Sequence, residues 1–586
     1  MLGQGEGEWQ IPQDEYTNRR VMTGHRIFSI DPSTAKDLDD ALSVRKLSVQ
    51  EYYEIGVHIA DVSYFVRPDT KLDTEAQSRA TTIYLVDRAV PMLPHILSEQ
   101  LCSLNPGTPR LAFSAVFTIR VTKPVSEEYP HDDVSILQTW LGRTIINSCC
   151  KMAYQNAQAV IEGGHLDAYP ASSSAEGRPQ LPPVSLYHGV SSADVENDIL
   201  LLDRLAKSMR ARRFATGSVS LDKVKFGFDL DTIKIPSGSS VQIQQDSNRL
   251  IEEFMLLANT AVAHHIAAFM PRSAFLRRHP FPLGRKMNEF LNSMASLAPH
   301  YQQLHPDCAP EDNPFASFSA RSSLEIHQSL SKFTDERTRM AVIQMCVVPM
   351  QRARYFPGGA VPAEIRKHYA LNEDLYTHFT SPIRRYPDVI VHRMATAMIN
   401  VNESAVTSRL KLTADSLVEL ASHCNARKEL ARAAQDNSDR LFITVLLVRL
   451  YHYAEATVID VMPRAIKVYV HGFGIERQLH YDQMQINNVE LDAKGKWVRL
   501  HWSQDDNSSE TAIKEIKMDE AALRKILHPS MFFNASDKGV NEGIDLENRT
   551  QSLRITSIVR VKVYPELKEN GFAQMEVNMA RPIQFD

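Results

Sequence analysis

The sequence has few cysteines, and their spacing suits neither a metal site nor a disulfide framework. Six cysteines are scattered through 586 residues without one Cys-X-X-Cys pair. This spacing argues against a zinc site and against disulfide bonds. It is typical of a protein that stays in a reducing compartment, so we expect a cytoplasmic protein.

The sequence also lacks the apolar segments that direct a chain to a membrane. It contains no run of about 18 apolar residues, and this absence predicts no membrane span. The first residues, MLGQGEGEWQIPQDEY, have no basic stretch followed by an apolar core, so they do not form a secretory signal.

A general excess of basic residues is missing too. The net charge is −5, which argues mildly against a nucleic-acid-binding protein, because such domains are often basic. Basic residues nevertheless gather at 207–213, 277–286 and 382–386. Each group taken alone favours a solvated surface, although a positively lined channel would need only such local charge.

The order of hydrophobic patterns predicts an α+β protein with a large domain followed by a small barrel. Residues 1–25 read as an irregular segment, and strand patterns dominate from 26 to about 120. Helical patterns then prevail as far as residue 450, apart from a Pro-, Ser- and Gly-rich stretch at 168–184 that predicts a flexible insertion. Short β-type runs over 455–583 predict an OB-type barrel.

The stretch SIDPSTAKDLDD crowds four aspartates at the exit of a predicted strand: Asp31, Asp37, Asp39 and Asp40. Carboxylates packed this closely raise one another's pKa unless a cation neutralises them. Oxygen ligands without His or Cys favour a hard cation, Mg²⁺ or Mn²⁺, and the spacing does not match an EF-hand. A metal site for displacement at phosphorus and a solvated acidic loop both remain open on spacing alone.

Six motifs in a fixed order carry a more specific signal. They are IDPSTAKDLDDALSV, GVHIADVSYFV, RATTIYLVDRAVPMLP, LSEQLCSLNPG, RLIEEFMLLAN and YTHFTSPIRRYPDVIVHR. Together they resemble the catalytic RNB domain of the RNase II / RNase R family of processive 3′→5′ exoribonucleases, over about residues 10–450. The chain looks most similar to the eukaryotic, exosome-independent branch that degrades RNA with 3′-oligouridine tails. The terminal barrel is similar to the family's S-one-type OB fold.

The resemblance implies a role for each aspartate. Asp31, Asp37 and Asp40 would hold Mg²⁺, with Mn²⁺ as a substitute, and Asp39 would also belong to the metal site while it positions or activates the attacking water. Arg384 would clamp the scissile phosphate, since its planar fork suits phosphate oxygens.

The resemblance also implies how the RNA is held. Tyr84 would stack on the terminal bases and set the length of the final product, and Tyr154 would lie near the leaving nucleotide. Stacking tolerates any base. Glu252, with Glu253 as its alternative, would contact the terminal ribose and favour RNA over DNA. Arg385 is the less favoured neighbour of Arg384.

Two departures from the family and two competing functions complete the expectations. Leu221 stands where the bacterial enzymes have an aromatic clamp, and the family's two N-terminal cold-shock domains are absent, through truncation or loss. We expect an active, monomeric exoribonuclease acting on single-stranded RNA in the cytoplasm, including P-bodies. The alternatives are an inactive RNB-fold regulator that binds mRNA and, less favoured, a phosphatase for small molecules.

Overall fold

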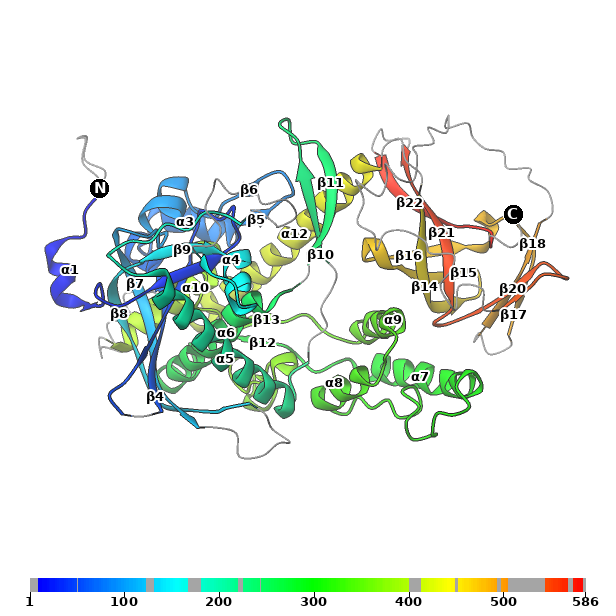
Figure 1. The fold of residues 1–586 in the computed structure, drawn as a ribbon, viewed down its shortest axis with the longest axis horizontal. Coiled ribbons are helices and arrows are strands. Elements are labelled where there is room, and N and C mark those ends of the chain that lie inside the picture. The colour runs from blue at the N-terminus through cyan, green and yellow to red at the C-terminus, as the bar shows by residue number, and fades with distance from the viewer. Residues whose placement is uncertain are drawn as a thin grey trace.

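The computed structural model describes residues 9–49, 51–122, 131–166, 181–219, 225–242, 244–399, 413–447, 452–492, 497–503, 543–567 and 573–582. A large mixed part leads through a long helix to a strand-rich part at the C-terminus (Figure 1). The α+β fold with a nearly closed C-terminal barrel is therefore confirmed. Leu221 and most of the predicted insertion at 168–184 lie outside the described residues.

A seven-stranded sheet forms the base of the large part. Its spatial order is β1-β8-β7-β4-β3-β2-β9, with parallel pairing only at the two edges, β1 with β8 and β2 with β9. The alternating or continuous apolar runs predicted before residue 120 are strands, and β8 is a long strand that the sequence patterns did not reveal. The strands are β1 (Arg20–Val21), β2 (Phe28–Asp31), β3 (Asp40–Lys46), β4 (Tyr52–Ala60), β7 (Pro109–Thr122), β8 (Asp133–Asn147) and β9 (Cys150–Ala153).

Helices cover this sheet. In α6, Phe254, Ala258 and Val262 repeat at helical spacing and are all buried, so the helix presents an apolar stripe to the core. The α-helices are α1 (Gln13–Asn18), α2 (Val62–Phe65), α3 (Lys71–Arg79), α4 (Tyr154–Ile161), α5 (Ser192–Thr216), α6 (Asp246–Phe269), α7 (Gly284–Leu304), α8 (Ser323–Ser331), α9 (Glu336–Val347), α10 (Tyr386–Ile399) and α12 (Ala414–Leu446).

Three two-stranded sheets and several short helices stand between these elements. Two are hairpins, β5 (Ile83–Tyr84) with β6 (Ala89–Val90) and β10 (Lys225–Leu230) with β11 (Pro236–Gln242), and the third pairs the distant strands β12 (Phe275–Arg278) and β13 (Arg354–Pro357). The short helices are the π-helix η1 (Ile96–Leu101) and the 3₁₀-helices η3 (Gly358–Ala360), η4 (Ala363–Ile365), η5 (Tyr369–Leu371), η6 (His471–Phe473) and η7 (Tyr481–Gln483).

The N-terminal segment is more ordered than the sequence predicted. Within residues 1–25, which were expected to be irregular, α1 and β1 form, and β1 pairs with β8. Between them the side chain of Arg19 is fully buried, and its Nη2 lies 2.7 Å from Asp61 Oδ2. This distant ion pair explains the error, because no local pattern announces it.

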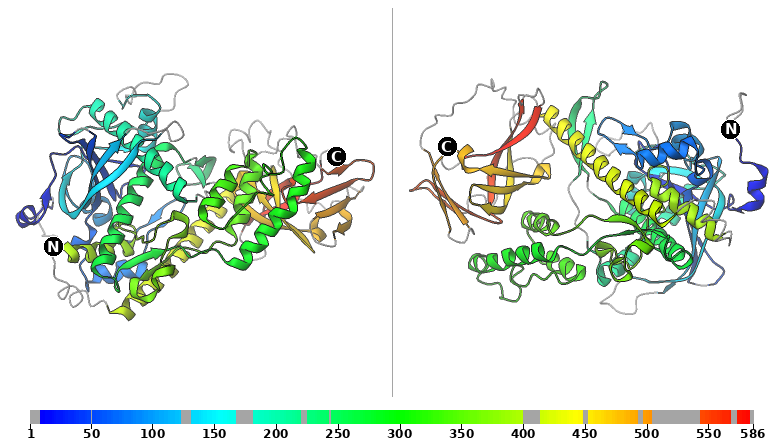
Figure 2. Two further views of the ribbon diagram at one scale, coloured as in Figure 1. Left: turned by 90° about the horizontal axis from the view of Figure 1, so that it is seen from below. Right: turned by 180° about the vertical axis from the view of Figure 1, so that it is seen from behind.

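Two sheets form the C-terminal barrel, which α12 joins to the large part. Figure 2 shows α12 running from the large part to the barrel, with α7, α8 and α9 on one side of the molecule. One sheet has the order β16-β15-β14-β21-β22, and the other has the order β17-β18-β20-β19. The strands are β14 (His452–Met462), β15 (Ala465–Val470), β16 (Ile475–His480), β17 (Ile486–Leu491), β18 (Trp497–Trp502), β19 (Ile544–Asp545), β20 (Thr550–Arg554), β21 (Ile558–Leu567) and β22 (Ala573–Met579).

Candidate active site

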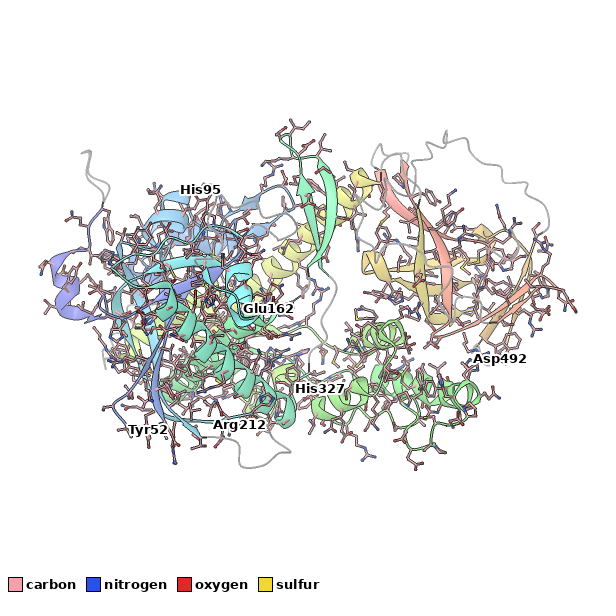
Figure 3. The ribbon with its side chains drawn as sticks, in the orientation of Figure 1. Tyr52, His95, Glu162, Arg212, His327 and Asp492 are labelled. Carbon is pink, nitrogen blue, oxygen red and sulfur yellow. The ribbon has the colours of Figure 1, made fainter. Side chains whose placement is uncertain are left out.

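The four aspartates lie at one end of the large sheet. Asp31 is the last residue of β2 and Asp40 is the first of β3, and these neighbouring strands run antiparallel. Asp40 pairs with Ile59, near the end of β4. Tyr52, at the start of β4, is labelled at the bottom of the large part in Figure 3. The aspartates therefore lie at the opposite end of the sheet from Tyr52.

Burial makes the carboxylates of Asp31, Asp39 and Asp40 resist ionisation. Desolvation is the largest cause that raises the pKa of Asp31 to about 7 and that of Asp40 to about 8, and each is raised further by neighbouring aspartates. Burial also raises the pKa of Asp39 well above its ordinary value, although Arg384 opposes the shift. A solvated acidic loop would not be buried in this way, so the structure favours the metal reading.

The donors fit a hard cation. Asp31 Oδ2 is buried without a hydrogen-bond partner among the described residues, and such an oxygen can be satisfied by a metal ion. Within the same residues, no three His, Cys, Asp or Glu side chains already converge as a ligand set. The aspartates would have to draw together around an ion, which would remove their mutual repulsion.

Asp39 and Arg384, 345 residues apart in the sequence, meet directly. Arg384 Nε lies 3.3 Å from Asp39 Oδ2, and the backbone N–H of Ile383 donates to Asp39 Oδ1 at 2.8 Å. Arg384 also donates to Ser381 Oγ at 2.9 Å. The Arg384 side chain remains 44% exposed. Its guanidinium is therefore available to a substrate phosphate while Asp39 holds the Nε atom.

The loop that carries Arg384 is fastened by residues that the sequence analysis did not single out. Asn259 Oδ1 accepts from the backbone N–H of Phe379 at 2.7 Å, and His392 Nε2 contacts the Phe379 carbonyl at 2.8 Å. Asp388 Oδ1 accepts from the Ser381 N–H at 2.8 Å. Asn259, Asp388 and His392 lie inside the quoted motifs LLAN and YPDVIVHR, so the motifs could have marked them as important. The motifs do not show which residues they contact.

Arg385 has a different position from Arg384. It donates to Asp388 Oδ1 at 2.6 Å, and the Asp388 side chain is completely buried. Burial by itself would lower the pKa of Arg385, but Asp388, Tyr355 and Tyr376 together outweigh that effect and raise it. The preference for Arg384 over Arg385 as the phosphate ligand is thus consistent with the geometry.

Two further basic residues, the buried Arg277 and the more exposed Lys428, lie near Arg385. Arg277 is only 8% exposed, and its guanidinium lies 4.9 Å from the centre of the Tyr355 ring. Lys428 Nζ lies 5.9 Å from the same ring. Burial, then Arg277 and Arg385, lower the pKa of Lys428 to about 6. The solvated-surface reading is therefore wrong for the first residue of 277–286 and for Arg385, because tertiary packing draws them inward.

Both predicted stacking tyrosines lie beside the aspartates. Tyr84 is 38% exposed, and its hydroxyl donates to Asp37 Oδ2 at 3.1 Å. Tyr154 begins α4, directly after Ala153, which pairs with Asp31 across β9 and β2. Burial raises the pKa of Tyr154, and the next largest causes are Asp40 and Asp31. The site therefore combines acidic groups, an arginine and two aromatic rings.

The glutamate pair faces α5. Glu253 is buried and accepts from both Arg213 Nε at 3.2 Å and Arg213 Nη2 at 2.5 Å, and Arg210 lies 3.4 Å away. Glu252 is more exposed, lies 3.8 Å from Arg213, and accepts from Gln244 at 3.3 Å. Glu253 is thus committed to an internal ion pair, which leaves Glu252 as the better candidate for a ribose contact.

Two histidines within the quoted motifs, His58 and His378, have internal partners. His58 is fully buried between Ser43 Oγ at 2.9 Å and Ser114 Oγ at 2.8 Å, and burial lowers its pKa to about 3. His378 Nδ1 contacts the Tyr355 hydroxyl at 2.6 Å. Neither contact joins these rings to the aspartates.

Comparison with known sequences decides the family. The RNB domain matches residues 19–447, and the DIS3-like exonuclease 2 C-terminal domain matches 453–532. The chain belongs to the RNB family. It is 39% identical to DIS3-like exonuclease 2 of Xenopus tropicalis over 496 residues, which cover 83% of this chain and 54% of the relative. The chain therefore spans about half the length of the curated relatives it matches.

Solved structures show the RNB fold in proteins of different activity. RNase R of Mycoplasma genitalium, in complex with ribose-methylated single-stranded RNA, matches with a TM-score of 0.70 and 18% identity, covering 98% of this chain and 74% of that one. Yeast Ssd1, a pseudonuclease, matches with a TM-score of 0.73 and 21% identity, covering 98% and 69%. The predicted family is confirmed, but the RNB fold alone does not imply catalysis.

The RNB family generally uses a divalent metal, and its exoribonucleases hydrolyse RNA from the 3′ end. The described part of this RNB chain contains no helix that is both long and apolar enough to cross a membrane.

Proposed function

We propose that this RNB protein is a magnesium-dependent exoribonuclease that shortens single-stranded RNA from the 3′ end and releases 5′-nucleoside monophosphates. The observation that carries the proposal is the 3.3 Å pair between the buried Asp39 and Arg384, in the segment that also carries Asp31, Asp37 and Asp40. It places a carboxylate able to hold a water next to an arginine able to hold a phosphate.

The residues divide the work of hydrolysis. Asp31, Asp37 and Asp40 would hold Mg²⁺, or Mn²⁺ in its place. A bound ion supplies an activated water and stabilises the leaving oxygen. Asp39, oriented by the Ile383 N–H, positions the attacking water at the phosphorus. Arg384 binds the phosphate and offsets the charge that develops on its oxygens.

The aromatic residues bind RNA without selecting its base sequence. Tyr84 and Tyr154 stack on bases near the 3′ end, and each stacked base contributes about 1–3 kcal/mol. Glu252 contacts the terminal ribose through its 2′-hydroxyl. We further propose a preference for 3′-oligouridylated RNA, action as a monomer independent of the exosome, and a place in the cytoplasm that includes P-bodies.

An inactive RNA-binding regulator is the second candidate, because a pseudonuclease shares the fold with a TM-score of 0.73. This chain keeps all four aspartates and Arg384, and the structure brings Asp39 and Arg384 together. A regulator that only binds RNA has no need of this arrangement, so catalysis is favoured.

The test uses the chain and 5′-labelled single-stranded RNA with an oligo(U) or an oligo(A) tail, in Mg²⁺ or in EDTA. We expect a ladder of shortened products in Mg²⁺ alone. Asp39→Asn should lower the rate by about 10²–10⁴-fold, the usual loss for a positioned acid–base group, with RNA affinity preserved. The matched control is Asp415→Asn, at the exposed first turn of α12.

The outcomes separate the proposals. Binding of RNA without a ladder would identify the regulator. Equal decay of the two tails would remove the uridine preference and leave the nuclease intact. Full activity in Asp39→Asn would contradict the assignment of the site.

A further inference from the structure

The hairpin β5–β6 that carries Tyr84 is bonded at its base to the arginine loop. The Thr82 N–H donates to the Arg384 carbonyl at 3.0 Å, and Thr81 Oγ1 donates to the same carbonyl at 3.1 Å. The Met92 N–H closes the base by donating to Thr82 Oγ1 at 3.0 Å. The base of this hairpin therefore follows the position of Arg384.

The tip of the hairpin is held by two other parts of the chain. The Val86 N–H donates to Ser438 Oγ of α12 at 3.1 Å. Lys234 Nζ, from the turn between β10 and β11, donates to the Asp87 carbonyl at 2.9 Å. Ser438 and Lys234 thus contact adjacent residues of one turn from two separate elements.

These two elements also contact each other, so they form one support. Phe442 lies one helical turn beyond Ser438, and its ring centre is 6.0 Å from that of Phe228 in β10. β5–β6 itself has only two paired positions, Ile83 with Val90 and Tyr84 with Ala89. An isolated hairpin is marginally stable at best, so the support must determine where its tip lies.

The position of the tip matters because Tyr84 lies two residues before Val86. Its hydroxyl reaches Asp37 at 3.1 Å, so a movement of the turn displaces the ring relative to the aspartates. Displacements of about 1 Å at a reacting site can cost a large factor in rate.

We propose that Ser438 and Lys234 are positioning residues that hold Tyr84 in register and so fix the length at which RNA trimming stops. The inference rests on the proposed exoribonuclease function. Neither residue touches the substrate, and each acts through the backbone of the hairpin turn.

The experiment compares Ser438→Ala, Lys234→Met and the double variant with the native chain on 5′-labelled RNA, in Mg²⁺. We expect the final product of the double variant to be longer by one or more nucleotides. The KM for RNA close to the final length should rise by about two- to tenfold, the factor that one ordinary hydrogen bond gives, while kcat on long RNA stays within about twofold. Ser438→Thr, which keeps the hydroxyl, should restore the native product.

Matched controls are Ser422→Ala on an exposed position of α12 and Lys286→Met on an exposed position of α7, and both should leave the final product unchanged. Circular dichroism melts identify any loss of folding, and the single variants provide the answer if the double variant unfolds. An unchanged final product and KM in Ser438→Ala and Lys234→Met would overturn the inference while the nuclease stands. Absence of trimming by the native chain would overturn both.

Discussion

Replacing Arg384 by methionine should mainly slow hydrolysis, whereas replacing its neighbour Arg385 should mainly destabilise the fold. Arg384→Met removes a side chain that is 44% exposed and pairs with Asp39 at 3.3 Å. The pair is partly solvated and Asp39 retains the Ile383 N–H, so we expect the free energy of unfolding to change by at most about 1 kcal/mol. Loss of a charge-stabilising donor should slow hydrolysis by about 10²–10³-fold.

Arg385→Met should instead destabilise the fold. Asp388, whose side chain is completely buried, would keep the Ser381 N–H at 2.8 Å but lose its charged partner. Leaving one member of a buried pair alone costs about 3–5 kcal/mol. The rate per folded molecule should fall much less than in Arg384→Met, because the Arg385 guanidinium is paired with Asp388 and not with Asp39.

Urea denaturation and single-turnover hydrolysis, corrected for the folded fraction, separate the two effects. Arg285→Met, on an exposed residue of α7, controls for loss of a surface arginine and should change neither quantity. The reasoning fails if Arg384→Met hydrolyses RNA at the native rate, or if the two variants lose stability equally.

Three further variants test the network and the site. Asp61→Asn should lower the unfolding free energy by less than the about 3–5 kcal/mol of an unpaired buried charge, because Arg19 would lose Asp61 but keep its ion pair with Glu15. Burial opposes ionisation of Asp61, yet Arg19 and Arg143 lower its pKa to about 2. The difference in unfolding free energy between the native chain and Asp61→Asn should therefore be complete above about pH 4 and disappear as the pH falls through 2. A difference that stays constant in urea denaturation across this pH range would contradict the prediction. Lys428→Met should stabilise the protein, because burial, Arg277 and Arg385 lower the pKa of Lys428 to about 6. The gain should be largest at and below pH 6 and shrink toward the ordinary lysine pKa of 10.5. A loss of stability at pH 6 in the same assay would contradict this. Tyr84→Ala should raise the KM for short RNA at least about fivefold, because one stacked base is lost. An unchanged KM in steady-state trimming would contradict this.

Local patterns in the sequence were sufficient for the fold class and for part of the site. The helical spacing of Phe254, Ala258 and Val262 predicts α6, because a helix buries every third or fourth residue whatever its neighbours are. Asp31 and Asp40 bracket one loop between adjacent strands, so their proximity follows from chain connectivity. β8 escaped prediction because most residues in its first half are exposed or half-buried, so they show no clear apolar period.

The sequence by itself determined that four carboxylates lie within ten positions at a strand exit, since they are neighbours along the chain. Only the tertiary structure decided which arginine faces them, because Arg384 and Arg385 share one motif and differ in what long-range packing places beside each. The same applies to Arg19, drawn into the core by Asp61, and to Ser438, brought to the hairpin turn from 352 residues away. Such contacts depend on how distant elements pack, and no periodicity within either segment encodes the partner.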